Sequence, residues 1–543
     1  MTDRQLAALG DPQANRETGR IRSPRRGFGH PALTLVAVTF GLVMVVLDNT
    51  IVSVANPTIG RHFNASLGEL QWVTSAYLLA LAGGLITGGR LGDRFGRKRI
   101  FLIGTAGFAL ASLACGLSGS LAELIAFRAV QGCFGALLFP QTLAILRATF
   151  PPERLAQAVG IWGGASAIAT ASGPIIGGAL VESVSWSSIF FVNVPVGIIS
   201  LLVGGWVIRE SRDLGTGRSI DLLGVVLLSG GLFSLIWALI DAETAGWGNS
   251  TVVGFLAAAV VLLAVFTAWQ RVARTPLIPL AIFRSRQLSA GLAVLVAAVF
   301  ALFGVIFYLT LYLQRIHGDS PITAGISLLP LTGVLMVSAP VGGWIVGRIG
   351  PRLPLTVGFV LVAIALIGLS RLEPHSAYLA IGAWLPLIGI AFGAVQTGGS
   401  QAVVGSAPRH LAGVAAGLQA TAFQVGGVLG TTVLGTVVAS RVASVYQHQL
   451  IRAGVPGGLA HRLQPATATV AEGLAPRVAG TTAAVSHAIT AASLTSFTSG
   501  LQLALEIGAA VALAAAAGAF LLLRSGGSRH RSMEQVGDVQ LAA

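Results

Sequence analysis

Long apolar runs separated by short polar loops dominate the chain. A helix needs about 20 apolar residues to cross the hydrocarbon core of a bilayer. Runs of roughly that length recur from residue 33 to residue 523. The pattern predicts fourteen membrane-spanning helices, at about 33–56, 70–90, 99–118, 121–145, 155–181, 189–208, 221–241, 251–270, 289–313, 323–347, 354–371, 376–400, 411–440 and 500–523.

Composition agrees with this pattern. Of the 543 residues, 54% are hydrophobic and only 10% are charged, and the mean hydropathy is +0.80, whereas soluble domains carry about 25% charged residues. We therefore expect an all-α polytopic membrane protein. A net charge of +14 would suggest nucleic acid as a partner in a soluble protein, but here the arginines lie in loops and tails, so no nucleic-acid partner is expected.

The basic residues also predict the orientation. With the N-terminus inside, 26 of the 34 basic residues fall on the cytoplasmic side, as the positive-inside rule requires. The first apolar run lacks a small-residue cleavage site and is predicted to be a retained helix. We expect a multi-pass protein of the cytoplasmic membrane with both termini in the cytoplasm. The excess of 33 arginines over one lysine suggests a GC-rich bacterial genome.

An internal repeat divides the chain. Gly89, Arg94 and Gly96 recur at an offset of 254 within the segment Gly343–Arg352, but Asp93 aligns with Gly347. Duplicated membrane halves commonly enclose a central site and rock about it. The predicted organisation is a cytoplasmic tail at 1–32, a six-helix bundle at 33–208, linkers with two inserted helices at 209–288, a second six-helix bundle at 289–523, and a cytoplasmic tail at 524–543. The second bundle includes a long outer loop, 441–499, which is expected to form short helices or to be disordered.

The segment Gly89–Arg99 carries six charges between two apolar runs. Its basic residues are explained by topology alone. Asp93 and the glycine spacing are not, and they favour a conformational latch in which Asp93 pairs with Arg94 or Arg97. The latch residues are predicted to be Gly89, Asp93, Arg94, Gly96, Arg97 and Lys98, with Glu153 as a further candidate.

Two charged residues fall deep inside predicted spans. Asp48 lies about two-thirds along the first span, and Arg128 lies in the fourth. Intramembrane charges are costly unless they are paired, so function is the default hypothesis. Asp48 suits a proton carrier or a counter-ion for a cationic substrate, with Arg128 as its partner; the structural alternatives are a helix-end anchor and snorkelling to the interface. Glu506 in the last span is either a second protonation site or an outward-facing residue.

Four motifs at residues 47–197 resemble the major facilitator superfamily, and more narrowly its fourteen-helix drug:proton antiporter branch. They are Leu47–Pro57, the segment Gly89–Arg99, Arg128-Ala-Val-Gln131-Gly132, and Ser172-Gly173-Pro174-Ile-Ile-Gly177-Gly178, supported by Asn193-Val-Pro195-Val-Gly197. The chain departs from the branch at Ser53, Asn56 and Ser187-Ser188. The resemblance implies the major facilitator fold of two six-helix bundles plus two inserted helices. It also implies an antiport helix with Gly173, Pro174, Gly177 and Gly178; tight packing is its structural alternative.

Polar and aromatic residues within spans are candidates for lining a transport cavity, although each one alone is more often interhelical glue. They are Asn49, Tyr77, Gln131, Gln141, Trp162, Trp237, Gln396, Gln401, Gln419 and Gln424. The sequence contains no nucleotide-binding loop and no metal-ligand spacing, so we expect no enzymatic activity, no metal and no cofactor, with the proton gradient as the energy source.

These features together predict a proton-coupled antiporter that exports hydrophobic or cationic drug-like compounds by alternating access and so confers multidrug resistance. Its partners would be small molecules, protons and the bilayer, and a monomer is expected. One alternative is a dedicated exporter of a single endogenous natural product or lipid-like metabolite. An alternative of another class is a non-transporting membrane sensor.

Overall fold

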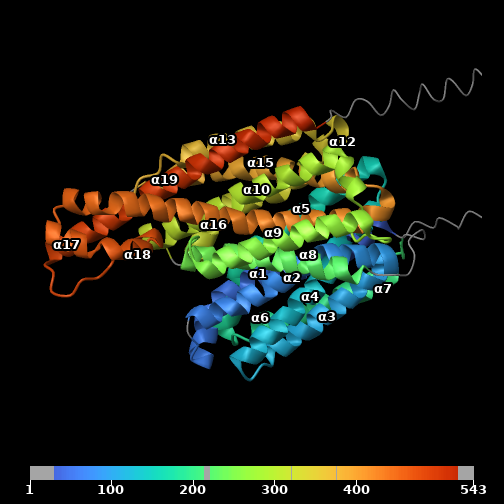
Figure 1. Cartoon of the computed structure of the whole chain (residues 1–543), viewed down its shortest axis with the longest axis horizontal. Coiled ribbons are helices and arrows are strands. Elements are labelled where there is room, and N and C mark those ends of the chain that lie inside the picture. The colour runs from blue at the N-terminus through green and yellow to red at the C-terminus, as the bar shows by residue number, and fades with distance from the viewer. Residues whose placement is uncertain (1–29, 66, 213–220, 320, 375, 524–543) are drawn as a thin grey trace, which may run out of the picture.

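Fourteen helices of the described chain are long and apolar enough to cross a membrane, which confirms the predicted count. The computed structural model describes residues 30–65, 67–212, 221–319, 321–374 and 376–523. Most of the predicted N-terminal tail, the linker residues 213–220 and the predicted C-terminal tail lie outside the described residues. Figure 1 shows the long helices running side by side in one elongated bundle.

The first half of the bundle contains six membrane passes. Its last pass is broken, because a single residue separates the end of α6 from the start of α7. The elements are α1 (Pro31–Phe63), α2 (Leu67–Phe95), α3 (Arg97–Gly116), α4 (Leu121–Thr149), α5 (Pro152–Ser183), α6 (Ser188–Phe191) and α7 (Asn193–Val207).

The second half is interrupted by short and irregular turns. Two passes end in π-helical turns, η4 and η5. The elements are α10 (Arg286–Leu311), η4 (Tyr312–Ile316), α11 (Pro321–Ser327), α12 (Leu329–Ile349), α13 (Arg352–Leu369), α14 (Tyr378–Gly382), α15 (Leu385–Ser400), η5 (Gln401–Gly405), η6 (Arg409–Leu411), α16 (Ala412–Arg452), α17 (Gly457–Arg462), η7 (Gln464–Ala466), α18 (Thr467–Ala471) and α19 (Ala483–Leu522).

The predicted repeat has a structural counterpart at its glycines. Gly96 separates α2 from α3 with a φ of 113°, and Gly350 separates α12 from α13 with a φ of 81°. Both angles lie in the region that favours glycine. The repeated glycines therefore make the same tight turn in each half.

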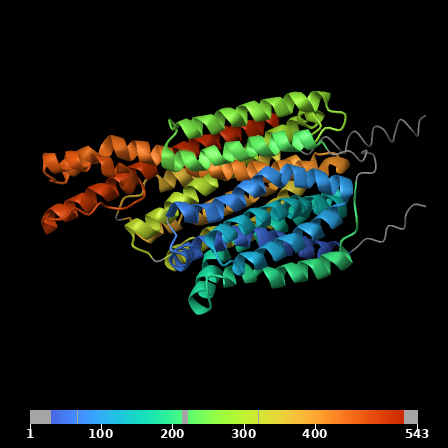
Figure 2. The ribbon, with the colours of Figure 1, turned by 60° about the horizontal axis from the view of Figure 1, so that its bottom comes forward.

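The inserted pair α8 (Leu222–Ala245) and α9 (Ser250–Val272) runs along one side of the bundle, where the two halves meet (Figure 2); η3 (Leu280–Arg284) follows it. Hydrogen bonds tie α8 to both halves: Ser229 Oγ donates to the Gly83 carbonyl at 2.7 Å, and Thr432 Oγ1 donates to the Leu239 carbonyl at 3.0 Å. The pair thus covers the seam between α2 and α16.

Asp221 begins this inserted pair. Its carboxylate caps α8 by accepting from the Gly224 N–H at 2.8 Å, and it also accepts from Trp269 Nε1 and Gln270 Nε2, each at 2.7 Å. Partial burial raises the pKa of Asp221, but these hydrogen bonds outweigh it and leave the pKa below its ordinary value. The cap therefore holds both inserted helices at one end.

The segment 441–499 contains the expected short helices, α17 and α18, but it also contains the ends of two long helices. We call it the extension. About half of it belongs to α16 and α19, which run beyond the bundle as continuous helices, with α17 and α18 between them (Figures 1 and 2). Val442, Tyr446 and Leu450 recur every four residues on α16 and are fully buried, as is Ile489 on α19 at 1% exposure. This stripe packs the two helices together; the small residues that made the sequence only weakly apolar allow their close approach.

Glycines close the bundle at the end that carries Arg90–Arg99, which we call the arginine-rich end. A methyl group added at Gly89 would collide with the Gly413 carbonyl, and one added at Gly343 would collide with the Ala156 carbonyl. These contacts join α2 to α16 and α12 to α5. The two halves therefore touch backbone to backbone at this end.

Candidate functional site

A buried ion pair lies inside the first half. Arg128 Nη1 on α4 is 2.5 Å from Asp48 Oδ2 on α1, and both side chains are fully buried. The Arg128 guanidinium also lies over the Tyr77 ring, 4.1 Å from its centroid. The structure thus brings together the two intramembrane charges that the sequence singled out.

Uncharged groups add hydrogen bonds to this pair, although Arg128 Nη2 is buried without a hydrogen-bond partner. Asp48 Oδ1 accepts from Gln131 Nε2 and from Asn193 Nδ2, each at 2.9 Å. Arg128 Nε donates to the Val73 carbonyl at 3.1 Å, and its Nη1 donates to Gln131 Oε1 at 2.7 Å. Such partners are what allow an ion pair to persist away from water.

Asn193 was not among the predicted site residues. It comes from α7 and also donates to Ser112 Oγ at 3.0 Å, which fixes its carboxamide from a second side. The only sequence signal was its position at the head of the Asn193–Gly197 motif. Nothing in that motif indicates a contact with a residue 145 positions earlier in the chain.

A central cavity of about 330 Å³ lies between the two halves. Helices α1, α2, α4 and α5 of the first half and α10, α12, α15 and α16 of the second contribute its walls. Among the described residues, the lining includes five aromatic rings and eight uncharged polar side chains but no charged residue; the polar residues are Asn49, Thr50, Ser166, Thr170, Thr332, Gln396, Gln424 and Thr431. Its volume and apolar character are those of a small-molecule site.

Only some of the predicted cavity residues line it: Asn49, Trp162, Gln396 and Gln424. Others are held elsewhere. Tyr77 donates to the Val45 carbonyl at 3.3 Å, Gln131 belongs to the ion-pair network, and Gln141 donates to the Gly88 carbonyl at 2.8 Å. Gln419 donates to Ser400 Oγ at 2.7 Å. The remaining two lie outside the lining, Gln401 at the start of η5 and Trp237 in a small pocket beside α2.

Asp48 itself does not line the cavity. Val45, Val46, Asn49 and Thr50 of α1 do. On a helix of 3.6 residues per turn, Asp48 lies on a different face from this set. The ion pair is therefore next to the cavity wall but turned into the first half.

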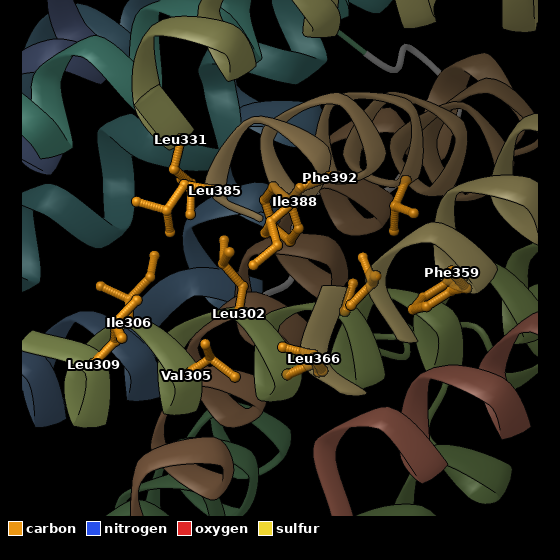
Figure 3. Close-up of a pocket in the computed structure, with 14 residues that line it drawn as sticks. Leu302, Val305, Ile306, Leu309, Leu331, Phe359, Leu366, Leu385, Ile388 and Phe392 are labelled. Carbon is orange, nitrogen blue, oxygen red and sulfur yellow. The ribbon is translucent and has the colours of Figure 1, made fainter. Parts of the chain in front are cut away.

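A second void lies behind the cavity wall, inside the second half. Its volume is about 10 Å³ and all fourteen residues around it are apolar (Figure 3). Leu302, Ile306, Leu331 and Phe392 line both spaces. This void is too small and too apolar for a ligand.

Asp93 links the two halves at the arginine-rich end. Its Oδ1 accepts from Arg97 Nη2 at 2.6 Å and Nε at 3.0 Å, and from the Gly413 N–H at 2.8 Å. Its Oδ2 accepts from the Val414 N–H at 3.0 Å. Gly413 and Val414 form the first turn of α16, where unpaired N–H groups and the helix dipole favour an anion.

The other predicted latch residues have different surroundings. Lys98 Nζ donates to the Gly205 carbonyl at 2.6 Å, and Arg94 lies 5.2 Å from the Phe95 ring centroid. In the parts of the chain described, Glu153 is exposed and forms no ion pair. Glu210 was not predicted; its carboxylate accepts from the N–H groups of Lys98 and Arg99, each at 3.1 Å, and so caps α3.

The predicted antiport helix α5 packs closely on α1. Gly173 leaves no space for a methyl group because Thr50 lies against it, and a methyl group at Gly177 would lie 2.8 Å from Ile51 Cγ1. Gly178 faces open space. Pro174 lies within the same helix. The glycines at 173 and 177 thus have a packing role, whatever else they do.

Glu506 lies on α19 and is exposed. It takes no part in the two ion pairs found among the described residues. The same residues contain no group of three or more His, Cys, Asp or Glu side chains that could hold a metal ion.

Comparisons with known proteins agree with this architecture. A family model described as Major Facilitator Superfamily matches residues 38–431. The chain is 47% identical to the tetracenomycin C resistance and export protein of Streptomyces glaucescens, over 92% of this chain and 93% of that protein. It is 31% identical to the multidrug efflux pump LfrA of Mycolicibacterium smegmatis, over 91% of this chain and 96% of that protein.

A solved structure supports the same fold. The human organic anion transporter MFSD10 superposes with a TM-score of 0.55 at 14% identity, covering 82% of this chain and 99% of that one. The matched family consists of transporters, so this chain is a transport protein and not an enzyme. It belongs to the Major Facilitator Superfamily, where its relatives include drug and antibiotic resistance exporters.

Proposed function

We propose that this protein is a proton-coupled antiporter that exports hydrophobic or cationic drug-like compounds across the cytoplasmic membrane by alternating access. The observation that carries the proposal is the buried Asp48–Arg128 ion pair beside a cavity enclosed by both halves. The resistance and export functions named for its relatives support the direction of transport. We place the arginine-rich end in the cytoplasm.

Proton coupling follows from how the pair is built. In the ion pair, Asp48 accepts hydrogen bonds from Arg128, Gln131 and Asn193. A proton arriving on Asp48 would remove the charge that compensates Arg128, so α1, α4 and α7 would have to readjust. Because α1 also forms part of the cavity wall, this readjustment would be felt by a bound substrate.

Alternating access requires an end that opens and closes. Asp93 and the glycine contacts hold the arginine-rich end shut in this structure, so the cavity in this state would communicate with the opposite side. Releasing Asp93 from the first turn of α16 would allow the halves to separate at the cytoplasmic end. This is the latch hypothesis, with the Asp93–Arg97 pair and α16 as its working parts.

The driving force is sufficient for export. Each proton moving inward yields about 1.4 kcal/mol per pH unit and about 2.3 kcal/mol per 100 mV. An energised membrane would therefore support roughly hundredfold accumulation per proton.

The test is substrate-dependent proton flux in proteoliposomes that contain a pH-sensitive dye. Wild-type protein should dissipate an imposed pH gradient when a drug-like substrate is added. The double variant Asp48→Asn/Arg128→Gln removes both charges of the pair together and should show no such flux. Glu182→Gln is the control, because it removes an exposed acid at the end of α5 instead.

Each outcome separates the candidate functions. Undiminished flux in the double variant would rule out Asp48 as the coupling site. Flux with a single compound out of a chemically diverse panel would favour a dedicated natural-product exporter, a role that the 47% identity to one antibiotic's export protein makes worth testing. Absence of any substrate-dependent flux in the wild type would favour the sensor alternative.

A further inference from the structure

In the part of the chain that the structure describes, the central cavity is lined by hydrogen-bonding groups and aromatic rings but by no counter-ion. We infer that its ligands are uncharged, planar, polycyclic aromatic molecules that carry hydroxyl donors, and that permanent cations are discriminated against. This inference rests on the proposed function, because it takes the cavity to be the transport site, and it narrows the substrate class proposed there.

Rings contributed by five different helices surround the cavity. Phe139 comes from α4, Trp162 from α5, Phe303 from α10, Phe392 from α15 and Phe423 from α16. Aromatic side chains bury flat rings well, through stacked and edge-on contacts. A volume of about 330 Å³ is in the range of sites for small drug-like molecules.

A cation in this cavity would meet no charged side chain among the described residues of the lining. A cation that leaves water for an apolar site loses its hydration and needs a carboxylate in return. The aromatic rings alone give a cation–π attraction that is smaller than this cost. Asp48 is the acid beside the wall, but it is turned away from the cavity and already accepts from Arg128, Gln131 and Asn193.

The threonines of the cavity wall favour ligands that donate hydrogen bonds. Thr170, Thr332 and Thr431 each donate their hydroxyl hydrogen to a carbonyl of their own helix, at distances between 3.0 and 3.4 Å. Their oxygens therefore remain available mainly as acceptors. A phenolic hydroxyl on a flat aromatic ligand matches these oxygens, whereas an aprotic ligand does not.

Three carboxamides add further hydrogen-bonding groups to the cavity wall. Asn49, Gln396 and Gln424 come from α1, α15 and α16, and each can both donate and accept. Gly163 makes room for one of them, since Gln396 Oε1 lies 3.3 Å from where a Cβ at that position would be. These groups can bind the carbonyl or hydroxyl oxygens of an uncharged ligand from both halves.

Three pyrene probes of the same ring size test the inference. They are 1-hydroxypyrene, which is uncharged with a hydroxyl donor, 1-methoxypyrene, which lacks the donor, and (1-pyrenylmethyl)trimethylammonium, a permanent cation. Binding to the full-length purified protein is measured by energy transfer from tryptophan to pyrene. We expect 1-hydroxypyrene to bind at least tenfold more tightly than the ammonium, about 1.4 kcal/mol, and more tightly than 1-methoxypyrene.

An engineered counter-ion gives the decisive variant. Gln424→Glu places a carboxylate in the cavity and should raise ammonium binding at least tenfold. Gln447→Glu makes the same change on the same helix but outside the cavity lining, and should have no effect. If Gln424→Glu does not fold, Gln396→Glu supplies the same test from α15.

The inference is overturned if the wild type binds the ammonium as tightly as 1-hydroxypyrene, binds neither, or gains nothing from a carboxylate in the cavity. Its failure is distinguishable from failure of the proposed function. Proton-driven transport of the ammonium as efficient as that of 1-hydroxypyrene would sink the selectivity alone. The expected binding preference without any proton-driven flux would leave the selectivity standing and remove the antiporter.

Discussion

Asp48 and Arg128 behave as one unit at the scale of single residues. Both are fully buried, and every hydrogen bond described for Asp48 comes from Arg128, Gln131 or Asn193. Removing one charge from such a unit costs far more than removing both, because the remaining charge is left buried without compensation. Structural and functional effects at this site can therefore be separated by the choice of variants.

The first prediction uses that difference. Asp48→Asn alone should lower the free energy of unfolding by about 3–5 kcal/mol, because Arg128 stays buried without its partner. Asp48→Asn/Arg128→Gln should recover most of this loss while remaining inactive in proton coupling. Thermal unfolding of the purified proteins measures both. A single variant as stable as the wild type would contradict the description of the pair as mutually dependent.

Residue-scale prediction from the sequence reached the charges but not their partners. Asp48 and Arg128 stand out because charges are rare within apolar runs. Asn193 does not stand out, because a carboxamide near a helix end is common and its partner lies on another helix. Which candidate polar residues line the cavity depends on helix rotation, and so four of the ten candidates line it.

At the scale of helices, the contact between α2 and α16 combines a charge with close packing. Asp93 binds the first turn of α16 only because Gly89 and Gly413 allow the backbones to touch. The sequence indicated an asymmetric latch from the missing acid at Gly347. It could not indicate that Asp93 binds the first turn of α16, because a helix N-terminus carries no distinctive side chain.

The second prediction concerns this latch. Asp93→Asn weakens charge-assisted hydrogen bonds, each about 1.5–3 kcal/mol, so it should shift the equilibrium toward an open arginine-rich end by on the order of tenfold. Spin labels at positions 154 and 353, one in each half, report the separation in a cysteine-free background. Asp221→Asn is the control, since that acid caps α8 without joining Asp93's contact. An unchanged distance distribution would leave topology as the sole role of the segment.

The third prediction compares two glycines of α5. Gly173→Ala should destabilise the protein by about 1–3 kcal/mol, because its methyl group would overlap Thr50 on α1. Gly178→Ala meets nothing within 4 Å and should be neutral or slightly stabilising. Thermal unfolding and proton flux, measured side by side, check both. Equal losses at the two positions would contradict the packing role.

Across the whole molecule, the two halves differ in chemistry although they share a repeated sequence pattern. The first half buries an ion pair, while the large core of the second half is built from apolar side chains. Proton exchange is therefore proposed for the first half, where the buried ion pair lies. The sequence predicted the fourteen passes because they depend on local apolar runs. It did not predict the extension, whose stability depends on pairing between α16 and α19.

The fourth prediction tests the independence of the extension. Tyr446 is fully buried between α16 and α19, so Tyr446→Ala should cost about 3–5 kcal/mol locally. Hydrogen exchange should accelerate within residues 441–499, while ligand binding in the cavity stays unchanged. His448→Ala, at an exposed position two residues away, should alter neither. Loss of cavity binding in the Tyr446 variant would mean that the extension supports the transport site.

Helix α16 is continuous from the residues that bind Asp93, past Phe423 and Gln424 in the cavity wall, to Arg452 in the extension. At 1.5 Å per residue its 41 residues form a rod on the order of 60 Å long. A tilt of a few degrees at its base would displace the far tip by several ångströms. The position of the tip therefore reports the tilt of α16. Fluorophores attached at the tip would follow single turnovers. A nanobody that binds the tip would hold the transporter in one state without touching the cavity.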